Sequence, residues 1–401
     1  MTDNHYDFLM VGGGLTTATA VREMAGSRQP GSIGILAEEN DPPYDRQPLS
    51  KDFLLGDMER EAVFLLTEET SREHGIGLHL GNPVRQLDPD AHTVTTADGS
   101  RFTYGKLLIA SGCHLRRLSI PGSDLPGLFY LRTLSQSEAL RAAAIEAKQA
   151  VVIGGGFIGL EVASALAQLG LDVSVIHRAD RLADRFGNEE ISAFFDELFA
   201  GHEVHIVYED EAANLFGEGR VEGVETKSGR IMPCDLAVAG IGVQPDTAYL
   251  QDSGLALDNG VVVNKRLEAS AKDIYAAGDI ANFFDTIYSR RRRVEHRDNA
   301  ISQGKLAAHN LAGAAEAFHH VSYFYSNVFG LTYECLGDMT DFDEVVTRGS
   351  FELKSASALY LKDGVLQAAF LLGRPYEERK VFEELIAGHE HMDAVLARLS
   401  S

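Results

Sequence analysis

Two glycine-rich segments have the residue types and spacing needed to hold a phosphate-bearing ligand. The first is Gly12-Gly13-Gly14-Leu15-Thr16-Thr17, and the second is Gly154-Gly155-Gly156-Phe157-Ile158-Gly159. In such a pattern the first glycine makes a tight turn, and the next lets a pyrophosphate approach backbone N–H groups at a helix start. The second segment is complete, whereas Thr17 replaces the third glycine of the first. Both segments therefore predict dinucleotide binding.

The residue after the second strand of each unit indicates whether the bound ribose has free hydroxyls or a 2′-phosphate. Glu38 follows the strand predicted at residues 33–36, where a carboxylate accepts hydrogen bonds from ribose hydroxyls. In the second unit His177 and Arg178 take this position. A cationic pair there favours a ribose 2′-phosphate, and hence NADPH over NADH. The alternative is that both are solvated surface residues and that NADH is the coenzyme.

Each glycine segment lies inside a strand–helix–strand pattern. The first pattern covers residues 6–36, and the second covers residues 150–176. Two such units predict two dinucleotide-binding domains. Further buried strands are predicted at 107–112, 235–241 and 273–277, a hairpin at 94–100, and a helix at 299–312. From Val321 onward the predicted elements are strands at 358–362 and 365–372 and a helix at 376–386, which indicates a smaller third domain.

Composition excludes several classes of function. The chain has 401 residues and a net charge of -23, which disfavours binding to nucleic acid or to an anionic membrane surface. No apolar run is long enough to span a bilayer, and a strand begins too early for a targeting segment. Cys113, Cys234 and Cys335 lie too far apart in the sequence for a CxxC pair or a metal cluster. The sequence therefore predicts a cytoplasmic protein without a metal site or a dithiol relay.

Five further segments carry distinctive residues, and they span most of the chain. They are Pro43-Tyr44-Asp45-Arg46-Gln47-Pro48-Leu49-Ser50-Lys51, Ala110-Ser111-Gly112, Ile274-Tyr275-Ala276-Ala277-Gly278-Asp279, Arg293-Val294-Glu295-His296-Arg297-Asp298-Asn299-Ala300 and Phe324-Tyr325-Ser326-Asn327. With the glycine turns they resemble the FAD-dependent pyridine-nucleotide oxidoreductases of the glutathione reductase fold. Within that family they look like the branch of ferredoxin, putidaredoxin and rubredoxin reductases and apoptosis-inducing factors. The fourth segment is most similar to the apoptosis-inducing factors.

The resemblance implies a fold and a domain order. The expected fold class is α/β, with two Rossmann-like dinucleotide-binding domains, one inserted in the other, plus a C-terminal α+β interface domain. The FAD-binding domain would comprise residues 1–113 and 238–318. The NAD(P)H-binding domain would comprise 114–237, and the interface domain 319–401.

The resemblance also implies roles in holding FAD. Glu38 would bind the adenosine ribose, Arg46 the pyrophosphate side, and Asp279 the ribityl chain. Asp279 could instead cap the helix that follows it. The remaining cofactor-binding candidates are turn residues of the matching segments and one glycine near the end of the inserted domain: Ala110, Ser111, Gly112, Gly242 and Gly278.

Four residues are implied as catalytic: Lys51, Glu161, His296 and Tyr325. Lys51 and Glu161 would form an ion pair beside the flavin N5, where an ammonium favours incoming electron density and the carboxylate offsets its desolvation. Glu295 and His296 would lie by the flavin pyrimidine edge or the nicotinamide. A loop histidine bonded to backbone is the alternative for His296. The chain has no tryptophan, so Tyr325 or Phe324 would supply any ring stacking.

The implied activity is hydride transfer from NAD(P)H to FAD N5, with electrons passed on to a ferredoxin- or rubredoxin-type iron–sulfur protein. Arg290-Arg291-Arg292-Arg293, with Arg116, Arg117 and Arg297, could form a basic dock for such a partner, or a solvated charged loop. Two other functions stay open: an apoptosis-inducing-factor-like NAD(P)H oxidase or redox sensor, and a non-catalytic nucleotide-binding scaffold. Both a monomer and a homodimer are compatible with the sequence.

Overall fold

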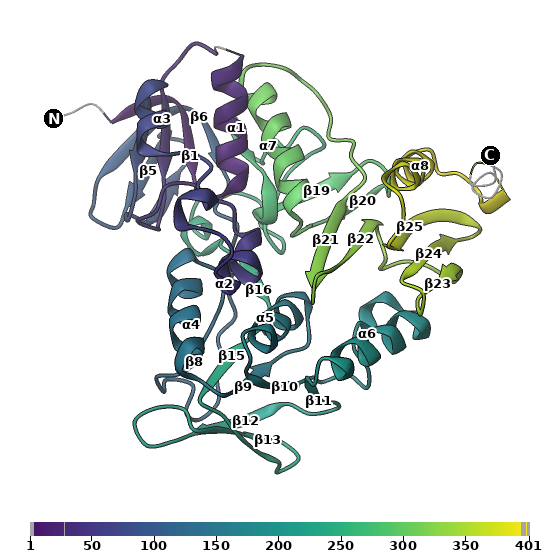
Figure 1. The fold of residues 1–401 in the computed structure, drawn as a ribbon. Helices are drawn as coiled ribbons and strands as arrows, with labels where there is room; N and C mark the ends of the chain where they lie inside the picture. The colour runs from purple at the N-terminus through teal and green to yellow at the C-terminus, as the bar shows by residue number, and fades with distance from the viewer. Residues whose placement is uncertain (1–3, 28, 394–397, 399–401) are drawn as a thin grey trace. The chain divides into compact units, whose positions relative to one another are not determined.

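The structure is a computed structural model that describes residues 4–27, 29–393 and 398, and these form two compact units. Unit 1 contains the chain up to Asp45, Arg60–His114 and Gln244–Ser322. Unit 2 contains Arg46–Glu59, Leu115–Val243 and the chain from Tyr323 onward. Residues 46–59 therefore cluster with unit 2, although the domain prediction assigned them to the FAD-binding segments. Figure 1 traces the elements of both units.

The main sheet of unit 1 is largely parallel. Its strands are β1 (His5–Val11), β2 (Ile33–Leu36), β3 (Ile76–His79), β4 (Val84–Asp88), β5 (Thr93–Thr96), β6 (Arg101–Ile109) and β18 (Ile274–Ala276). The order is β3-β2-β1-β6-β5-β4, and β18 also pairs with β6. Because β1, β2, β3, β6 and β18 run parallel, their carboxyl ends lie at one edge of the sheet. The chain after β1, β2 and β18 supplies the predicted ligand-binding residues of this unit.

Two helices pack together beside this sheet, α1 (Leu15–Gly26) and α7 (Arg297–Leu311), as Figure 1 shows. Their close approach depends on Gly304, since a Cβ there would lie 2.7 Å from the carbonyl oxygen of Thr16. Leu9 and Met10 of β1 are fully buried, as expected for a parallel strand covered on both faces. Unit 1 also contains the short helices α3 (Glu68–Glu73) and η5 (Gly278–Ile280).

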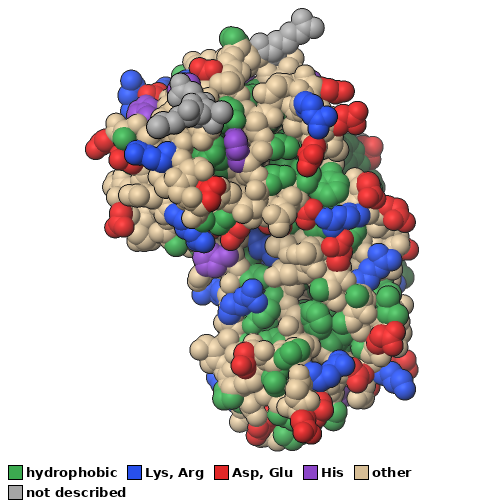
Figure 2. Space-filling model, turned by 90° about the vertical axis from the view of Figure 1, so that its left-hand side faces the viewer, with side chains coloured by type: hydrophobic (Ala, Val, Ile, Leu, Met, Phe, Trp, Pro, Cys, Tyr) green, Lys and Arg blue, Asp and Glu red, His purple; other side chains and the backbone are tan. Residues whose placement is uncertain are grey.

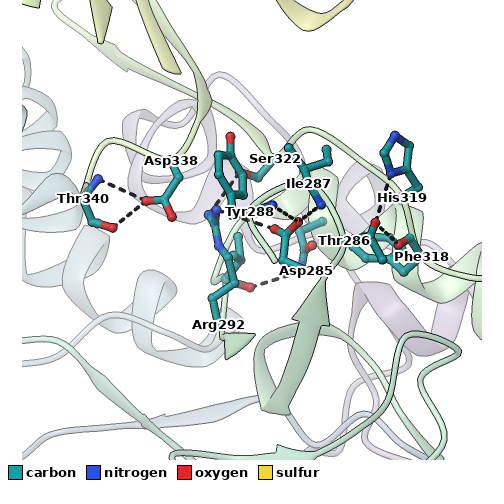
Figure 3. Close-up of polar contacts among 12 residues, drawn as sticks. Asp285, Thr286, Ile287, Tyr288, Arg292, Phe318, His319, Ser322, Asp338 and Thr340 are labelled. Atoms are coloured by element: carbon teal, nitrogen blue, oxygen red, sulfur yellow. Dashed lines mark hydrogen bonds and ion pairs between the residues drawn. The ribbon is translucent and has the colours of Figure 1, made fainter. Parts of the chain in front are cut away.

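A small sheet of unit 1 contains the arginine run. It consists of β17 (Val261–Val262), β19 (Ala281–Asp285) and β20 (Arg290–Arg292), and β19 and β20 are antiparallel. Arg292 lies 3.6 Å from the buried Asp285 and donates to Ser322, as Figure 3 shows. Asp285 also accepts hydrogen bonds from the backbone N–H groups of Ile287 and Tyr288.

The neighbouring arginines are also bound within unit 1. Arg291 donates to the carbonyl oxygens of Val263 and Asn282, Arg293 pairs with Glu295, and Arg297 pairs with Asp45. The charged-loop alternative for residues 290–292 is therefore wrong, because they form a strand. These contacts hold Arg291, Arg292, Arg293 and Arg297 within unit 1. On the face drawn in Figure 2, basic and acidic side chains are interspersed.

The main sheet of unit 2 is fully parallel. Its strands are β8 (Leu128–Phe129), β9 (Gln149–Ile153), β10 (Asp172–Ile176), β11 (His205–Val207) and β15 (Leu236–Ala239), in the order β11-β10-β9-β15-β8. An antiparallel sheet follows, made of β12 (Ala212–Phe216), β13 (Gly223–Thr226) and β14 (Ile231–Pro233). The helices of this part are η1 (Gln47–Ser50), α2 (Asp52–Leu55), α4 (Leu134–Glu146), α5 (Phe157–Gln168), η3 (Asp184–Phe186) and α6 (Glu189–Gly201).

The C-terminal part of unit 2 is an antiparallel sheet with a helix. The elements are β21 (Tyr323–Val328), β22 (Leu331–Gly337), β23 (Glu344–Ser350), β24 (Ser355–Lys362), β25 (Val365–Leu372) and α8 (Tyr376–Ala387). The sheet order is β21-β22-β25-β24-β23. Tyr360 and Phe370 are fully buried in its core. Two parallel dinucleotide-type sheets and this C-terminal domain confirm the predicted fold class.

The remaining short elements are η2 (Arg60–Val63), β7 (Cys113–Leu115), β16 (Val243–Pro245) and η4 (Ala248–Leu250). In the part of the chain that the structure describes, no helix combines the length and apolar character needed to cross a membrane.

Candidate active site

The first glycine turn connects β1 to α1 in unit 1. Gly12 has φ +115°, and a Cβ on it would lie 2.2 Å from the carbonyl oxygen of Ala110. Only glycine fits there, because both the backbone angle and the neighbouring backbone exclude a side chain. Gly14 differs, since its φ is -101° and a Cβ on it would meet no described atom within 4 Å. Gly12 is therefore required by the fold, whereas Gly14 leaves space that the chain itself does not use.

Thr17 occupies the third-glycine position of this turn without disrupting it. Its buried side chain donates a hydrogen bond from Oγ1 to the Gly12 carbonyl oxygen at 2.7 Å. At the matching position of the second turn, a Cβ on Gly159 would lie 1.9 Å from the Gly154 carbonyl oxygen. The first turn therefore holds its helix by a side-chain hydrogen bond, where the second uses direct backbone contact.

Replacing Thr17 with valine should lower the free energy of unfolding by about 1–3 kcal/mol, because a buried carbonyl loses its donor. Urea unfolding measures this loss. Thr19→Val is the control, since the Thr19 hydroxyl bonds Leu15 one helical turn back, in a less buried position. An equal loss in both variants would contradict the special role of Thr17.

The second glycine turn connects β9 to α5 in unit 2. Gly154 has φ +109°, and a Cβ on it would lie 2.5 Å from the Gly240 carbonyl oxygen. Gly156 is open, and the single atom within 4 Å of a Cβ on it is Nη2 of Arg185, at 4.0 Å. The two turns thus share one construction, with a closed first glycine and an open one at the helix start.

The two residues after β10 differ in orientation. His177 is buried, and its Nε2–H donates to the carbonyl oxygen of Arg181 at 3.0 Å. Its Nδ1 would lie 2.6 Å from a Cβ on Gly155, so the ring packs beneath the turn. Arg178 is exposed. Of these two residues, only Arg178 is therefore available at the surface to meet an anionic group.

The predicted FAD residues of unit 1 follow the carboxyl ends of its parallel strands. Glu38 is exposed and lies shortly after β2. Asp279 is half-buried in η5, after β18. Gly278 beside it has φ +78°, and a Cβ on it would lie 2.3 Å from Oγ1 of Thr16. The turn at Gly278 is therefore held against the first turn of α1.

The Ala110-Ser111-Gly112 segment follows β6 in the same unit. Ser111 accepts a hydrogen bond from the Tyr249 hydroxyl at 3.1 Å, and Gly112 has φ +71°. The residues Ala110, Ser111 and Gly112 thus form a tight turn next to Gly12.

Gly242 lies in unit 2. Its φ is +94°, and its carbonyl oxygen accepts a hydrogen bond from the Arg116 N–H at 3.0 Å.

Lys51 and Glu161 form the predicted ion pair in unit 2. The Lys51 Nζ lies 2.7 Å from Oε1 of Glu161, and Glu161 is 4% exposed. Ser50 donates to Oε2 and Ser326 donates to Oε1, each at 2.5 Å. A buried carboxylate is stable only when its oxygens are paired and hydrogen-bonded, and here an ammonium and two hydroxyls do so.

One side of α5 packs along β21. Phe157 contacts Phe324 with ring centroids 4.9 Å apart, Ser326 bonds Glu161, and the Phe329 N–H donates to Ser164 Oγ at 2.7 Å. We call this series of contacts the α5–β21 seam. Because side chains alternate along a strand, Tyr325 projects away from the seam, and it is 39% exposed. Of the two candidates for ring stacking, Phe324 is engaged and Tyr325 is accessible.

Glu295 and His296 lie at the start of α7 in unit 1. His296 is the N-cap residue, and Glu295 is bound to Arg293 at 2.6 Å. The same guanidinium donates to the Asp279 carbonyl oxygen at 3.0 Å and to Cys113 Sγ at 3.3 Å. Arg293 thus ties the start of α7 to the Asp279 turn, and Cys113 is a packed residue of this contact.

Arg46 is half-buried at the start of η1 and donates to the Arg132 carbonyl oxygen at 2.8 Å.

Three residues that contact the predicted site residues were given no role by the sequence analysis. Ser50 and Ser326 belong to matching segments, but only the fold shows that they bond Glu161. Arg185 belongs to no motif, and its place beside Gly156 follows from the turn that contains it.

Each unit thus has a sheet with a glycine turn between a parallel strand and a helix, and unit 2 adds a buried Lys51–Glu161 pair. Residues 6–304 match the family model described as pyridine nucleotide-disulphide oxidoreductase, and residues 323–398 match the one described as reductase C-terminal. The chain belongs to the pyridine nucleotide-disulphide oxidoreductase family and is an oxidoreductase.

Among its relatives are several ferredoxin reductases. The chain is 36% identical to the 5,5′-dehydrodivanillate O-demethylase ferredoxin reductase subunit of a Sphingobium species, over 92% of this chain and 90% of that protein. The ferredoxin reductase for the CYP199A2 system of Rhodopseudomonas palustris matches with a TM-score of 0.92 and 31% identity, over 96% of both chains. Putidaredoxin reductase, solved as a covalent complex with putidaredoxin, matches with a TM-score of 0.92 and 28% identity, over 97% of this chain and 94% of that one.

Membership of this family implies FAD and NAD(P)H as cofactors. The residues present fit both. Gly14 and Gly156 each open space in front of a helix N-terminus, where backbone N–H groups attract a pyrophosphate. The chain therefore has one suitable turn for each dinucleotide, with α1 and α5 behind them.

Proposed function

We propose that this oxidoreductase passes electrons from NAD(P)H through FAD to a small iron–sulfur protein of the ferredoxin type. The Gly12–Gly14 turn holds FAD, with Glu38 at its ribose and Asp279 at its ribityl chain. The Gly154–Gly156 turn holds NAD(P)H. The partner class is suggested by the relatives, which include ferredoxin reductases and a reductase joined to putidaredoxin.

The observation that carries the proposal is the buried Lys51–Glu161 pair. Bound FAD can accept a hydride from NAD(P)H and release electrons singly. The Lys51 ammonium would stabilise negative charge that develops on a bound flavin, and Glu161 with its two serine donors keeps that ammonium in place. Lys51 and Glu161 therefore act by electrostatics and position, and the reaction requires no nucleophile from the chain.

The cysteines of this chain are poorly suited to accept the electrons. Cys113, Cys234 and Cys335 are buried, far apart in the sequence. Burial raises the pKa of the Cys234 thiol to about 12, and burial also raises the pKa of the Cys335 thiol. Thiol–disulfide exchange requires a thiolate, which these environments disfavour. Electrons would then leave to another protein. Three buried thiols are compatible with the cytoplasmic location that we infer.

Cytochrome c reduction by the FAD-loaded protein tests the function. We expect turnover with NADPH or NADH to depend on added [2Fe–2S] ferredoxin. Oxygen consumption that ferredoxin does not change would instead indicate an oxidase. A stable charge-transfer colour without turnover would indicate a redox sensor, and a flavin that NAD(P)H does not bleach would indicate a scaffold.

We further propose that NADPH is the preferred coenzyme and that Arg178 contacts its 2′-phosphate. Arg178 is exposed just after β10, where the ribose of a dinucleotide lies in this fold. His177, the other candidate, is buried and bonded to Arg181, so it supports the turn rather than the phosphate.

Replacing Arg178 with glutamine should lower kcat/KM for NADPH about 10-fold and leave the value for NADH nearly unchanged, because one charge-assisted contact is worth roughly 1.5–3 kcal/mol. Steady-state kinetics with both coenzymes gives the ratio. Lys227→Gln is a control, since Lys227 pairs with Glu211 on an exposed hairpin of the same unit. An unchanged ratio in Arg178→Gln would refute the NADPH preference.

A further inference from the structure

Gln303 is a buried amide of α7 that contacts the turn containing Gly278 and Asp279. The residue is 0% exposed. Its Oε1 accepts a hydrogen bond from the Gly278 N–H at 2.8 Å, from a residue 25 positions earlier in the sequence. Gly278 is the first residue of η5 and is itself buried. The acceptor for this backbone N–H is therefore a side chain of α7.

The other end of the same amide is not used in this way. In the part of the chain that the structure describes, Nε2 of Gln303 has no hydrogen-bond partner, and it is shielded from solvent. An unpaired buried donor is costly, and an apolar side chain of similar size, such as methionine, would avoid that cost. Packing of α7 alone therefore does not account for a glutamine here, whereas its bond to Gly278 does.

Two further contacts hold the same turn. Gly278 has φ +78°, and a Cβ on it would lie 2.3 Å from Oγ1 of Thr16, so the turn lies directly against α1. After it, the Asp279 carbonyl oxygen accepts a hydrogen bond from Arg293 at 3.0 Å. The backbone is thus bonded on both sides of Asp279, by Gln303 before it and by Arg293 after it. These two bonds restrict the direction in which the Asp279 side chain leaves the turn.

We propose that Gln303 is a positioning residue for bound FAD, which orients Asp279 toward the ribityl chain by holding the Gly278 N–H. The inference rests on the proposed function, which places the ribityl chain at Asp279. A hydrogen bond from a ribityl hydroxyl to a carboxylate depends on direction, and so the residue that fixes the turn contributes to affinity. Because Gln303 is fully buried, it acts through the turn and not by direct contact with the cofactor.

Titration of the apoprotein with FAD, followed by flavin fluorescence, tests this role. Gln303→Met removes the acceptor for Gly278 and the unpaired donor together, so the urea unfolding curve of the apoprotein should change little. FAD should nevertheless bind roughly 10-fold more weakly. Gln303→Glu keeps an acceptor at the same place and should restore most of the affinity at about pH 5.5, where burial favours its neutral form.

A double-mutant cycle with Asp279→Asn shows whether Gln303 acts through Asp279. The double variant Gln303→Met, Asp279→Asn should bind FAD about as weakly as Asp279→Asn alone, because the second change disturbs a contact that is already lost. Two losses of affinity that simply add would mean that Gln303 does not act through Asp279, and would overturn the proposal.

Asn310→Leu is the matched control, since Asn310 is a second buried amide of α7. Its Oδ1 accepts from the Glu316 N–H at 3.0 Å, and its Nδ2 donates to the carbonyl oxygens of Arg266 and Glu316. This variant should unfold at lower urea concentration and keep its FAD affinity, the reverse of Gln303→Met. Wild-type FAD affinity in Gln303→Met would also overturn the proposal. If the wild-type apoprotein bound no FAD, the proposed function itself would fail.

Discussion

Flavin reduction by NAD(P)H should become about 100-fold slower when Glu161 is replaced with glutamine, which is the size of effect seen when one preorganised electrostatic contact is lost. Glutamine has nearly the same side-chain volume and can accept a hydrogen bond from the Ser50 or Ser326 hydroxyl. It leaves the buried Lys51 ammonium without a counter-charge. Breaking a buried pair in this way should also lower the free energy of unfolding by about 3–5 kcal/mol. Stopped-flow absorbance and urea unfolding give the two values.

Two variants separate catalysis from stability. Glu211→Gln removes the carboxylate of an exposed pair with Lys227, in which both side chains are more than half exposed, so neither value should change appreciably. The double variant Lys51→Met, Glu161→Gln has no unpaired charge and should regain part of the lost stability, while flavin reduction stays slow. If Glu161→Gln reduced its flavin at the wild-type rate, the pair would have no role beside the flavin.

The second large effect is expected at Gly14. An alanine there meets no described atom within 4 Å and has an ordinary backbone angle, so the chain should fold with an unchanged unfolding curve in the absence of FAD. Bound FAD should nevertheless be held roughly 10- to 100-fold more weakly, because a methyl group inserted into a close contact costs about 1–3 kcal/mol. Titrating the apoprotein with FAD and following flavin fluorescence measures this loss.

Gly26→Ala is the control at the other end of α1. A Cβ on Gly26 also meets nothing within 4 Å, and so this substitution should leave FAD affinity intact. Gly12→Ala is the opposite case, since its Cβ would lie 2.2 Å from a carbonyl oxygen and the fold itself should suffer. Equal FAD affinity in Gly14→Ala and the wild type would show that the open space is not the pyrophosphate site.

The features that sequence reasoning predicted well are those set by neighbouring residues. The glycine turns, the strands beside them and the closing helix depend on local periodicity and on backbone angles that few residue types adopt. The run of residues 290–293 shows the limit of that approach. Four successive arginines are typical of a solvated loop, yet Arg290–Arg292 form β20, where Asp285 pairs with Arg292 and two backbone carbonyl oxygens accept hydrogen bonds from Arg291.

Side-chain contacts across long sequence distances could not be predicted in the same way. Ser326 and Glu161 are 165 residues apart, and nothing near either residue indicates that they bond. The orientation of His177 is a similar case, because its place after β10 is clear from the sequence but the direction of its ring is not. The position of Arg185 is set by a turn in which Ala183 and Gly187 have left-handed backbone angles and Phe186 is buried. No recognisable sequence motif marks this turn.

The α5–β21 seam has a consequence for the evolution and engineering of this enzyme. Residues 323–398 match a separate family model, yet Ser326 and Phe329 donate hydrogen bonds to α5, the helix that follows the second glycine turn. A chimera that takes its C-terminal domain from one reductase and its remainder from another would inherit a mismatched lining around Glu161. Functional hybrids should therefore require α5 and β21 to be exchanged as a set, and natural substitutions in the two segments should be inherited together.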